Sequence, residues 1–197
     1  MCRRPWLSPL IAVVLVLLAV AGCGRAPAFK GTVLADPVPA ADFTLVDQYG
    51  QPFRLADQRG RVVLLFFGYT SCPDVCPTTL TTWKQVEQEL GDRARDVRFV
   101  FITADPQRDT PERLRDHLAA FSPNFIGLTG TPEELDAVYR AYHVFVNALP
   151  AEGTSADYLV EHTAAVFAID ADGMWRLTFP FGTSPEDMAH DVRLLLP

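Results

Sequence analysis

The sequence is poor in cysteine. Four of its 197 residues are cysteines, and two of these, Cys2 and Cys23, lie in an N-terminal segment of different composition, which leaves Cys72 and Cys76 for the rest of the chain. Only three residues separate this pair, so a disulfide between them would close a very small loop and remove little entropy from the unfolded chain. With 49% hydrophobic residues, the chain can form a core without such a staple. The pair therefore calls for a chemical explanation.

Basic charge and long apolar runs are also scarce. Lysine and arginine number 17 against 24 acidic residues, and no basic patch with interleaved aromatic residues is present, so we expect no nucleic-acid partner. The apolar run Leu10 to Ala21 has twelve residues, whereas a membrane-spanning helix needs about 20. No internal repeat or low-complexity tract occurs. These absences favour one acidic globular domain with a short appendage.

The N-terminal segment has the order of an export signal. Residues 1–22 place two arginines before the apolar run, and the stretch Val20 to Cys23 resembles the lipobox of bacterial lipoproteins, in which the chain is cut before the cysteine and the cysteine carries lipid. We therefore predict lipidation at Cys23, with an uncleaved signal-anchor helix over residues 7–22 as the alternative. Removal of residues 1–22 takes away two arginines and no acidic residue, which changes the net charge from −7 to −9. Both interpretations place the domain outside the cytoplasmic membrane and tethered to it.

Strand-like and helix-like stretches alternate through the predicted domain, residues 42–197. The preceding residues, 23–41, are rich in proline and small side chains and predict an extended spacer. Continuous apolar runs predict buried strands, and a serine or threonine followed by proline and acidic residues predicts the start of a helix. The predicted elements are a β-hairpin over 43–55, strands over 61–69, 97–103 and 125–128, helices over 77–90, 110–121 and 131–142, an irregular excursion over 143–161, a β-hairpin over 162–181 and a last helix from 184. This order indicates an α/β, thioredoxin-like fold with an N-terminal β-hairpin extension and a C-terminal β-hairpin plus helix.

Cys72 and Cys76 lie where this fold brings a central strand to the first helix. Chemistry in open α/β sheets gathers at the carboxyl ends of strands. A helix N-terminus also favours an anion and lowers the pKa of a thiol from its reference of about 8.5. The thiolate both attacks disulfides and binds metals. The alternative is that the two cysteines are inert small apolar side chains.

The spacing of the pair departs from two familiar thiol sites. Thioredoxin-type dithiols have two intervening residues and this pair has three, while a peroxiredoxin carries a threonine three residues before its cysteine, where Pro73 precedes Cys76. Two adjacent thiolates repel each other, and a soft cation such as Cu(I), bound by thiolates and an imidazole, relieves that repulsion. A zinc site also fits such ligands. A thiol–disulfide oxidoreductase needs the two cysteines alone.

A metal site of this kind requires a histidine, and the sequence has four. His117 and His190 fall within amphipathic helices, where a partly exposed surface position is the default, and His143 lies in an aromatic stretch. His162 stands at the start of the predicted strand 162–170, after the excursion, where it can approach the cysteine loop. The residues alone favour His162 without deciding the choice.

Four segments resemble the SCO/SenC family of membrane-tethered copper chaperones, which help to assemble the binuclear copper centre of cytochrome c oxidase. They are FKGTVLADPVPAADFTLVDQYG, GYTSCPDVCPTTL, ITADPQRDTPERL and YLVEHTAAVFAID, in that order. The resemblance implies Cu(I) or Cu(II) ligands at Cys72, Cys76 and His162, with Asp105 as an accessory residue near the copper.

The resemblance also implies a function of binding and delivery without turnover. The implied partners are the copper-bearing subunit of cytochrome c oxidase, a copper-donor chaperone, a thioredoxin-like reductant and the membrane that holds the lipid or anchor. The competing hypothesis is an extracytoplasmic thiol–disulfide oxidoreductase that keeps the cysteines of the oxidase copper site, or of another exported protein, reduced.

Overall fold

The middle of the molecule is a mixed sheet built around strand β4 (Val62–Gly68). We analysed a computed structural model, which describes residues 28–150 and 158–197. Every residue of β4 is buried, as expected of a continuous apolar run that is covered on both faces. It pairs in parallel with β5 (Val97–Thr103) and antiparallel with β9 (Ala165–Ile169). The strands predicted over 61–69 and 97–103 are therefore confirmed as central strands.

Within residues 28–150 and 158–197, the main sheet has eight strands in the order β1-β10-β9-β4-β5-β6-β2-β3. Strands β4, β5 and β6 run parallel, and the flanking pairs are antiparallel. The remaining strands of this sheet are β1 (Thr32–Pro39), β2 (Thr44–Asp47), β3 (Pro52–Arg54), β6 (Ile126–Thr129) and β10 (Met174–Pro180). The hairpins predicted over 43–55 and 162–181 correspond to β2–β3 and β9–β10.

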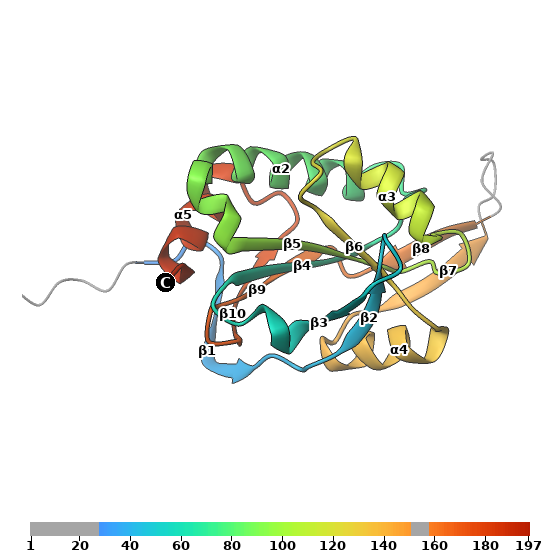
Figure 1. Cartoon of the computed structure of the whole chain (residues 1–197), viewed down its shortest axis with the longest axis horizontal. Coiled ribbons are helices and arrows are strands. Elements are labelled where there is room, and N and C mark those ends of the chain that lie inside the picture. The colour runs from blue at the N-terminus through green and yellow to red at the C-terminus, as the bar shows by residue number, and fades with distance from the viewer. Residues whose placement is uncertain (1–27, 151–157) are drawn as a thin grey trace, which may run out of the picture.

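Helices cover both faces of the sheet (Figure 1). Helices α2, α3 and α5 lie on one face and α4 lies on the other. Their bounds are α2 Val75–Leu90, α3 Pro111–Ala119, α4 Pro132–Ala141 and α5 Pro185–Leu195, and short 3-10 turns occur at Leu55–Gln58 and Gly91–Asp96. The described residues form two apolar clusters, one on each face of the sheet. No helix in the described ranges is long and apolar enough to cross a membrane.

Local capping explains where three of the helices begin. The side chains of Thr110, Thr131 and Ser184 each accept a hydrogen bond from a backbone N–H in the first turn of the following helix. At the start of α4, the Glu134 carboxylate also accepts a hydrogen bond from the backbone N–H of Thr131, which completes a capping box. These starts agree with the sequence prediction, because the capping signals are local. Helix α2 begins at Val75, two residues before the predicted start, so Cys76 lies inside its first turn.

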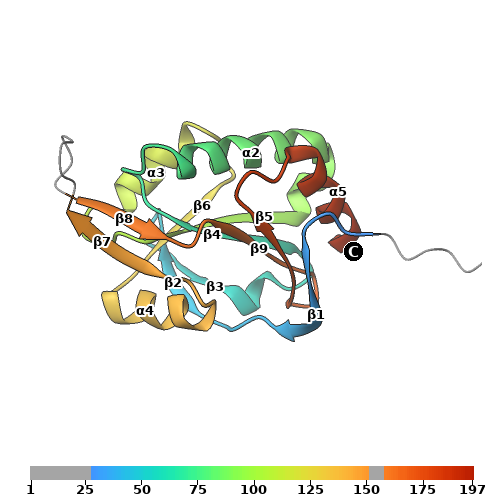
Figure 2. The same cartoon turned by 180° about the vertical axis from the view of Figure 1, so that it is seen from behind.

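Two segments differ from the sequence prediction. Residues 32–39, predicted as part of the extended spacer, form the edge strand β1 and pair with β10, so the sheet begins before residue 42. The excursion predicted over 143–161 is in part a regular two-stranded ribbon, β7 (Val146–Pro150) with β8 (Tyr158–His162). Figure 2 shows this ribbon at the end of the molecule opposite the C-terminus. The predicted signal and the predicted lipidation site at Cys23 lie outside the described residues.

Candidate metal centre

The cysteine loop connects the end of β4 to the start of α2. Cys72 is half-buried in the loop, and Cys76 is fully buried in the first turn of the helix. Gly68 ends β4 beneath them. A Cβ atom at this position would lie 2.9 Å from the Cys76 Sγ and 2.8 Å from the Phe101 ring. A glycine is therefore needed here to make room for the Cys76 sulfur, a signal that the sequence carried directly before the loop.

The two thiols are free and share a hydrogen-bonded arrangement. The backbone N–H of Cys76 lies 3.4 Å from the Cys72 Sγ, to which it donates. The hydrogen bond from the Cys76 thiol lowers the pKa of Cys72 to about 3, with further help from His162 and from backbone N–H groups, and against the effect of burial. The same bond, together with burial, raises the pKa of Cys76. At neutral pH the pair therefore holds one proton, with the thiolate at Cys72 and the thiol at Cys76.

His162 is the last residue of β8, not the first residue of β9 as predicted. Its Nε2 lies 3.6 Å from the Cys76 Sγ, and its Nδ1 lies 3.3 Å from the Thr163 carbonyl oxygen. With its proton on Nε2 the ring donates to the Cys72 thiolate, whereas in the tautomer that donates Nδ1–H to the Thr163 carbonyl, Nε2 presents a lone pair towards the sulfur atoms. The ring packs edge-on against Phe66 and Tyr69, with centroid distances of 5.8 and 6.0 Å. Backbone and aromatic contacts thus orient the imidazole.

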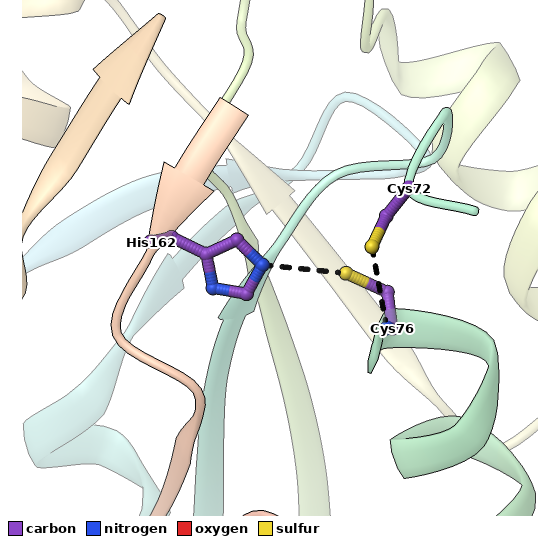
Figure 3. A group of neighbouring side chains, drawn as sticks. All are labelled: Cys72, Cys76 and His162. Atoms are coloured by element: carbon purple, nitrogen blue, oxygen red, sulfur yellow. Dashed lines mark hydrogen bonds between the residues drawn. The ribbon is translucent and has the colours of Figure 1, made fainter. Parts of the chain in front are cut away.

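Cys72, Cys76 and His162 converge in space. Each offers one ligand atom, and these atoms all lie within 4.8 Å of one another (Figure 3). Cys72 and His162 also line a groove of about 550 Å³ whose walls are mainly apolar, with Phe145, Leu149 and Leu159 among them. The arrangement offers two soft sulfur ligands and one imidazole, reachable from one side.

The other predicted histidines lie elsewhere. His117 is packed beside Phe101 and Phe121, and His190 contacts the carboxylate of Asp191. His143 is exposed in a turn after α4 with a φ of 55°. Within the described residues, the group of ligand atoms contains none of them. The structure therefore brings His162 alone, among the four, to the cysteine pair.

Asp105 is buried at the carboxyl end of β5, but it is not one of the clustered ligand residues. One carboxylate oxygen accepts the Tyr158 hydroxyl at 2.7 Å, and the other accepts the Arg108 Nε. The backbone N–H of Asp105 donates to the Thr103 hydroxyl. Both carboxylate oxygens are thus bound to neighbouring side chains.

Sequence reasoning missed Asp109, which holds the cysteine loop in place. Its buried carboxylate accepts the Thr70 backbone N–H at 3.1 Å, the Thr70 hydroxyl at 2.6 Å and the Thr103 hydroxyl at 2.7 Å. Burial raises the pKa of Asp109, and these hydrogen bonds oppose that rise. From the outer side, Arg113 donates to the hydroxyls of Thr70 and Ser71. The sequence did carry a signal for it: the segment ITADPQRDTPERL, which resembles the family, has this second acidic residue four positions after Asp105.

Comparison with known proteins identifies the family. The family model described as SCO1/SenC matches residues 35–196. The chain belongs to the SCO1/SenC family. The SCO2-like protein RC0895 of Rickettsia conorii is 37% identical over 152 residues, which cover 77% of this chain and 74% of that protein.

Two solved members of the SCO1/SenC family have the same fold. ScoI of Bradyrhizobium japonicum, described with copper bound, is 37% identical with a TM-score of 0.73, covering 80% of this chain and 99% of that one. The apo Sco1 protein of Thermus thermophilus is 37% identical with a TM-score of 0.77, covering 88% of this chain and all of that one. The predicted thioredoxin-like α/β fold is therefore confirmed.

Proposed function

We propose that this protein is a membrane-tethered copper chaperone that binds one copper ion through Cys72, Cys76 and His162 and delivers it to the binuclear copper centre of cytochrome c oxidase. The convergence of the three ligand atoms within 4.8 Å carries the proposal, because they come from a loop, a helix and a separate ribbon. The copper described in the related ScoI structure supports copper as the cargo.

The donor set suits a soft ion. Thiolate and imidazole ligands match Cu(I) in a site of low coordination number, and the same ligands also accept Cu(II). Because Cys72 is already a thiolate, uptake of copper requires the loss of one proton, from Cys76. Copper binding therefore strengthens as pH rises.

Exposure of the ligands supports an order of release. Cys72 and His162 line the groove, whereas Cys76 is fully buried. The ligands of an acceptor approach through the groove, displace Cys72 or His162 first and leave Cys76 as the last bond to the ion. Three protein ligands leave one side of the ion open for this exchange.

The proposed setting follows from the N-terminal segment and from the redox chemistry of the pair. Lipid on Cys23 tethers the domain to the extracytoplasmic face of a bacterial membrane, where the copper-bearing oxidase subunit and a copper donor reach it. A Cys72–Cys76 disulfide would abolish copper binding, so a thioredoxin-like reductant is a required partner.

A second candidate function is thiol–disulfide exchange. The lowered pKa of Cys72 and its position on the groove favour it, because an accessible thiolate is the attacking species in exchange. This activity would use Cys76 to resolve the mixed disulfide and would have no need of His162. His162 therefore separates the two functions.

A copper titration of the reduced full-length chain, purified in detergent, tests the proposal. The variants are Cys72→Ala, Cys76→Ala and His162→Asn, with His143→Asn as the matched control, since asparagine tolerates the positive φ at that position. We expect one copper per chain, weaker binding in the first three variants and unchanged binding in the control. Binding that is indifferent to His162→Asn, in a chain that reduces disulfides rapidly, would move the assignment to the oxidoreductase. Preference for zinc over copper in competition would overturn the cargo.

A further inference from the structure

Strand β8, which carries His162, stands outside the main sheet. On one side it pairs with β7. On the other side, side chains take the place of a neighbouring strand: the Arg108 Nη1 donates to the Tyr158 carbonyl oxygen at 3.1 Å, and the Val160 backbone N–H donates to the Tyr69 hydroxyl oxygen. Every second residue of a β-strand directs its backbone N–H and C=O groups to the same edge, so those of residues 158, 160 and 162 all lie on one edge of β8. The edge that leads to His162 is therefore held by loop residues.

Asp105, Arg108 and Tyr158 form a closed set of contacts on that edge. The Tyr158 hydroxyl donates to one oxygen of Asp105, and the Arg108 Nε donates to the other. The guanidinium lies 3.8 Å from the centroid of the Tyr158 ring and 5.7 Å from that of Tyr69. Arg108 thus donates to the backbone of Tyr158 and lies over the Tyr158 ring. It also pairs with Asp105, which accepts the Tyr158 hydroxyl.

The ion pair in this set is largely removed from water. The side chains of Arg108 and Asp105 are 20% and 3% exposed. A buried ion pair adds little to the stability of the fold, because the cost of desolvating the two charges offsets their mutual attraction. Removing one partner alone is costly, however, because the other charge is then buried without a counter-charge. Such a pair is therefore better suited to fixing the positions of the groups around it than to stabilising the fold.

The set reaches the candidate metal centre through Tyr69. The Tyr69 ring contacts the Arg108 guanidinium and also packs edge-on against the His162 ring at 6.0 Å. Cys72, three residues further on, is held to the Tyr69 carbonyl oxygen by its backbone N–H at 3.2 Å. The same aromatic residue thus touches the elements that carry two of the three ligands.

We propose that Asp105 and Arg108 are positioning residues, which clamp β8 at Tyr158 and thereby hold the His162 ring against the cysteine pair. The inference rests on the proposed copper function and deepens it. It gives Asp105 a role that involves no contact with the ion, in keeping with the use of both its carboxylate oxygens by Arg108 and Tyr158.

A double-mutant cycle on copper affinity tests the clamp. The main variant is Asp105→Asn/Arg108→Gln, which breaks the ion pair without leaving one charge buried alone. It is measured by competition titration of the full-length chain with either His162 or His162→Asn. The matched control is Asp170→Asn/Arg176→Gln, the same exchange in a partly buried pair with an N–O distance of 3.2 Å on the β9–β10 hairpin.

We expect the main variant to weaken copper binding by about 10–100-fold when His162 is present, the usual effect of losing a group that orients a ligand. In the His162→Asn background the further loss should be under about twofold, because a clamp that acts through His162 has nothing left to hold. The control should change affinity by less than about twofold in both backgrounds. The electron paramagnetic resonance spectrum of the Cu(II) form should lose its nitrogen coupling in the main variant and keep it in the control.

Equal losses in both backgrounds, or no loss in either, would overturn the clamp. If the main variant fails to fold, Tyr158→Phe decides, since it removes only the hydroxyl that binds Asp105: a loss that disappears in the His162→Asn background supports the clamp, and an unchanged affinity overturns it. Failure of the copper function gives a different result, because binding by the unmodified chain would then be indifferent to His162→Asn.

Discussion

The Nε2 atom of His162 lies 3.6 Å from the Sγ atom of Cys76, although His162 comes 86 positions later in the chain. The contact joins a ribbon outside the main sheet to the first turn of α2. In the unfolded chain the two cysteines stay close because they are near in sequence, but no contact holds His162 beside them. The three-ligand site therefore exists only in the folded protein, so its affinity depends on packing as well as on ligand chemistry.

Cys72 should react with iodoacetamide as a thiolate well below neutral pH. Its pKa is lowered to about 3 by the hydrogen bond from Cys76, so the thiolate persists as pH falls and is lost only near pH 3. The rate of alkylation should stay flat between about pH 5 and pH 8. In Cys76→Ala the bond is gone, the pKa rises, and below that pKa the rate should change about tenfold per pH unit, since only the thiolate reacts.

Stopped-flow alkylation with mass spectrometric location of the adduct gives this profile. Modification at Cys72 in the wild-type chain that increases steadily up to pH 9 would contradict the shared-proton arrangement. The contribution of the cysteine pair to the stability of the folded state should be largest near the ordinary thiol pKa of about 9.0 that both cysteines have when unfolded. Below it, falling pH protonates Cys72 in the unfolded chain first, and above it the buried Cys76 thiol resists ionisation, so each direction favours unfolding.

Gly68→Ala should weaken copper binding, whereas an equally tight substitution away from the cysteines should not. The added methyl would lie 2.9 Å from the Cys76 Sγ, and overpacking of this kind costs about 1–3 kcal/mol. Gly127→Ala is the matched control, because its Cβ would lie 2.7 Å from the Leu118 side chain, away from the cysteines. Urea unfolding should detect destabilisation in both variants, whereas copper titration should detect weaker binding in Gly68→Ala alone. Equal copper affinity in the two variants would refute a special role for Gly68.

Asp109→Ala should loosen the cysteine loop. It leaves the Thr70 N–H and the Thr103 hydroxyl without their acceptor, and each buried polar group left unpaired costs about 1–3 kcal/mol. Asp47→Ala provides the comparison, because that carboxylate also accepts two backbone N–H groups, but at the exposed β2–β3 turn where water replaces them. We expect a loss above about 2 kcal/mol in Asp109→Ala and below about 1 kcal/mol in Asp47→Ala. Faster hydrogen exchange at the Thr70 amide would locate the effect, and unchanged exchange there would argue against it.

Local signals account for the parts of the fold that the sequence predicted well. Residues 62–68 are apolar at every position because β4 is covered on both faces, and α4 starts directly after Thr131 because the Thr131 side chain and Glu134 complete the cap. Both signals can be recognised from residues adjacent in the sequence. The cysteine loop follows the same logic, since a buried strand that stops at a helix start places Cys72 and Cys76 at the edge of the sheet.

The arrangement of the site is less local. His162 was favoured by its position and chosen by family resemblance, because no periodicity reveals that an isolated ribbon folds back over the cysteine loop. Asp105 was expected near the copper, but only the folded structure reveals that Arg108 and Tyr158 donate hydrogen bonds to both oxygens of its carboxylate. Contacts among segments far apart in sequence are set by the whole fold, and a residue pattern within one segment does not encode them.

The edge strand β1 was missed because it contains prolines. Pro37 and Pro39 made residues 23–41 typical of an extended spacer, yet an edge strand tolerates proline, since it needs backbone N–H groups on one side only. Just before β1, the backbone N–H groups of Lys30 and Gly31 donate to the carboxylate of Asp191 at 2.9 and 2.8 Å. Asp191 is fully buried in α5. A chain that begins at residue 42 would therefore lose a strand and leave a buried carboxylate without these donors.

We predict that such a shortened chain is less stable than one that begins at residue 28. Hydrogen bonds to a charged group contribute about 1.5–3 kcal/mol each, so removal of both donors should cost at least about 3 kcal/mol in the free energy of unfolding. The same reasoning reverses the effect of Asp191→Ala in the two chains. In the longer chain this substitution removes two good hydrogen bonds and should destabilise, whereas in the shorter chain it removes a carboxylate that keeps only its contact with His190 and should be neutral or stabilising. Urea unfolding of the four proteins measures both effects, and equal destabilisation by Asp191→Ala in the two chains would mean that the Lys30 and Gly31 amides do not hold the carboxylate.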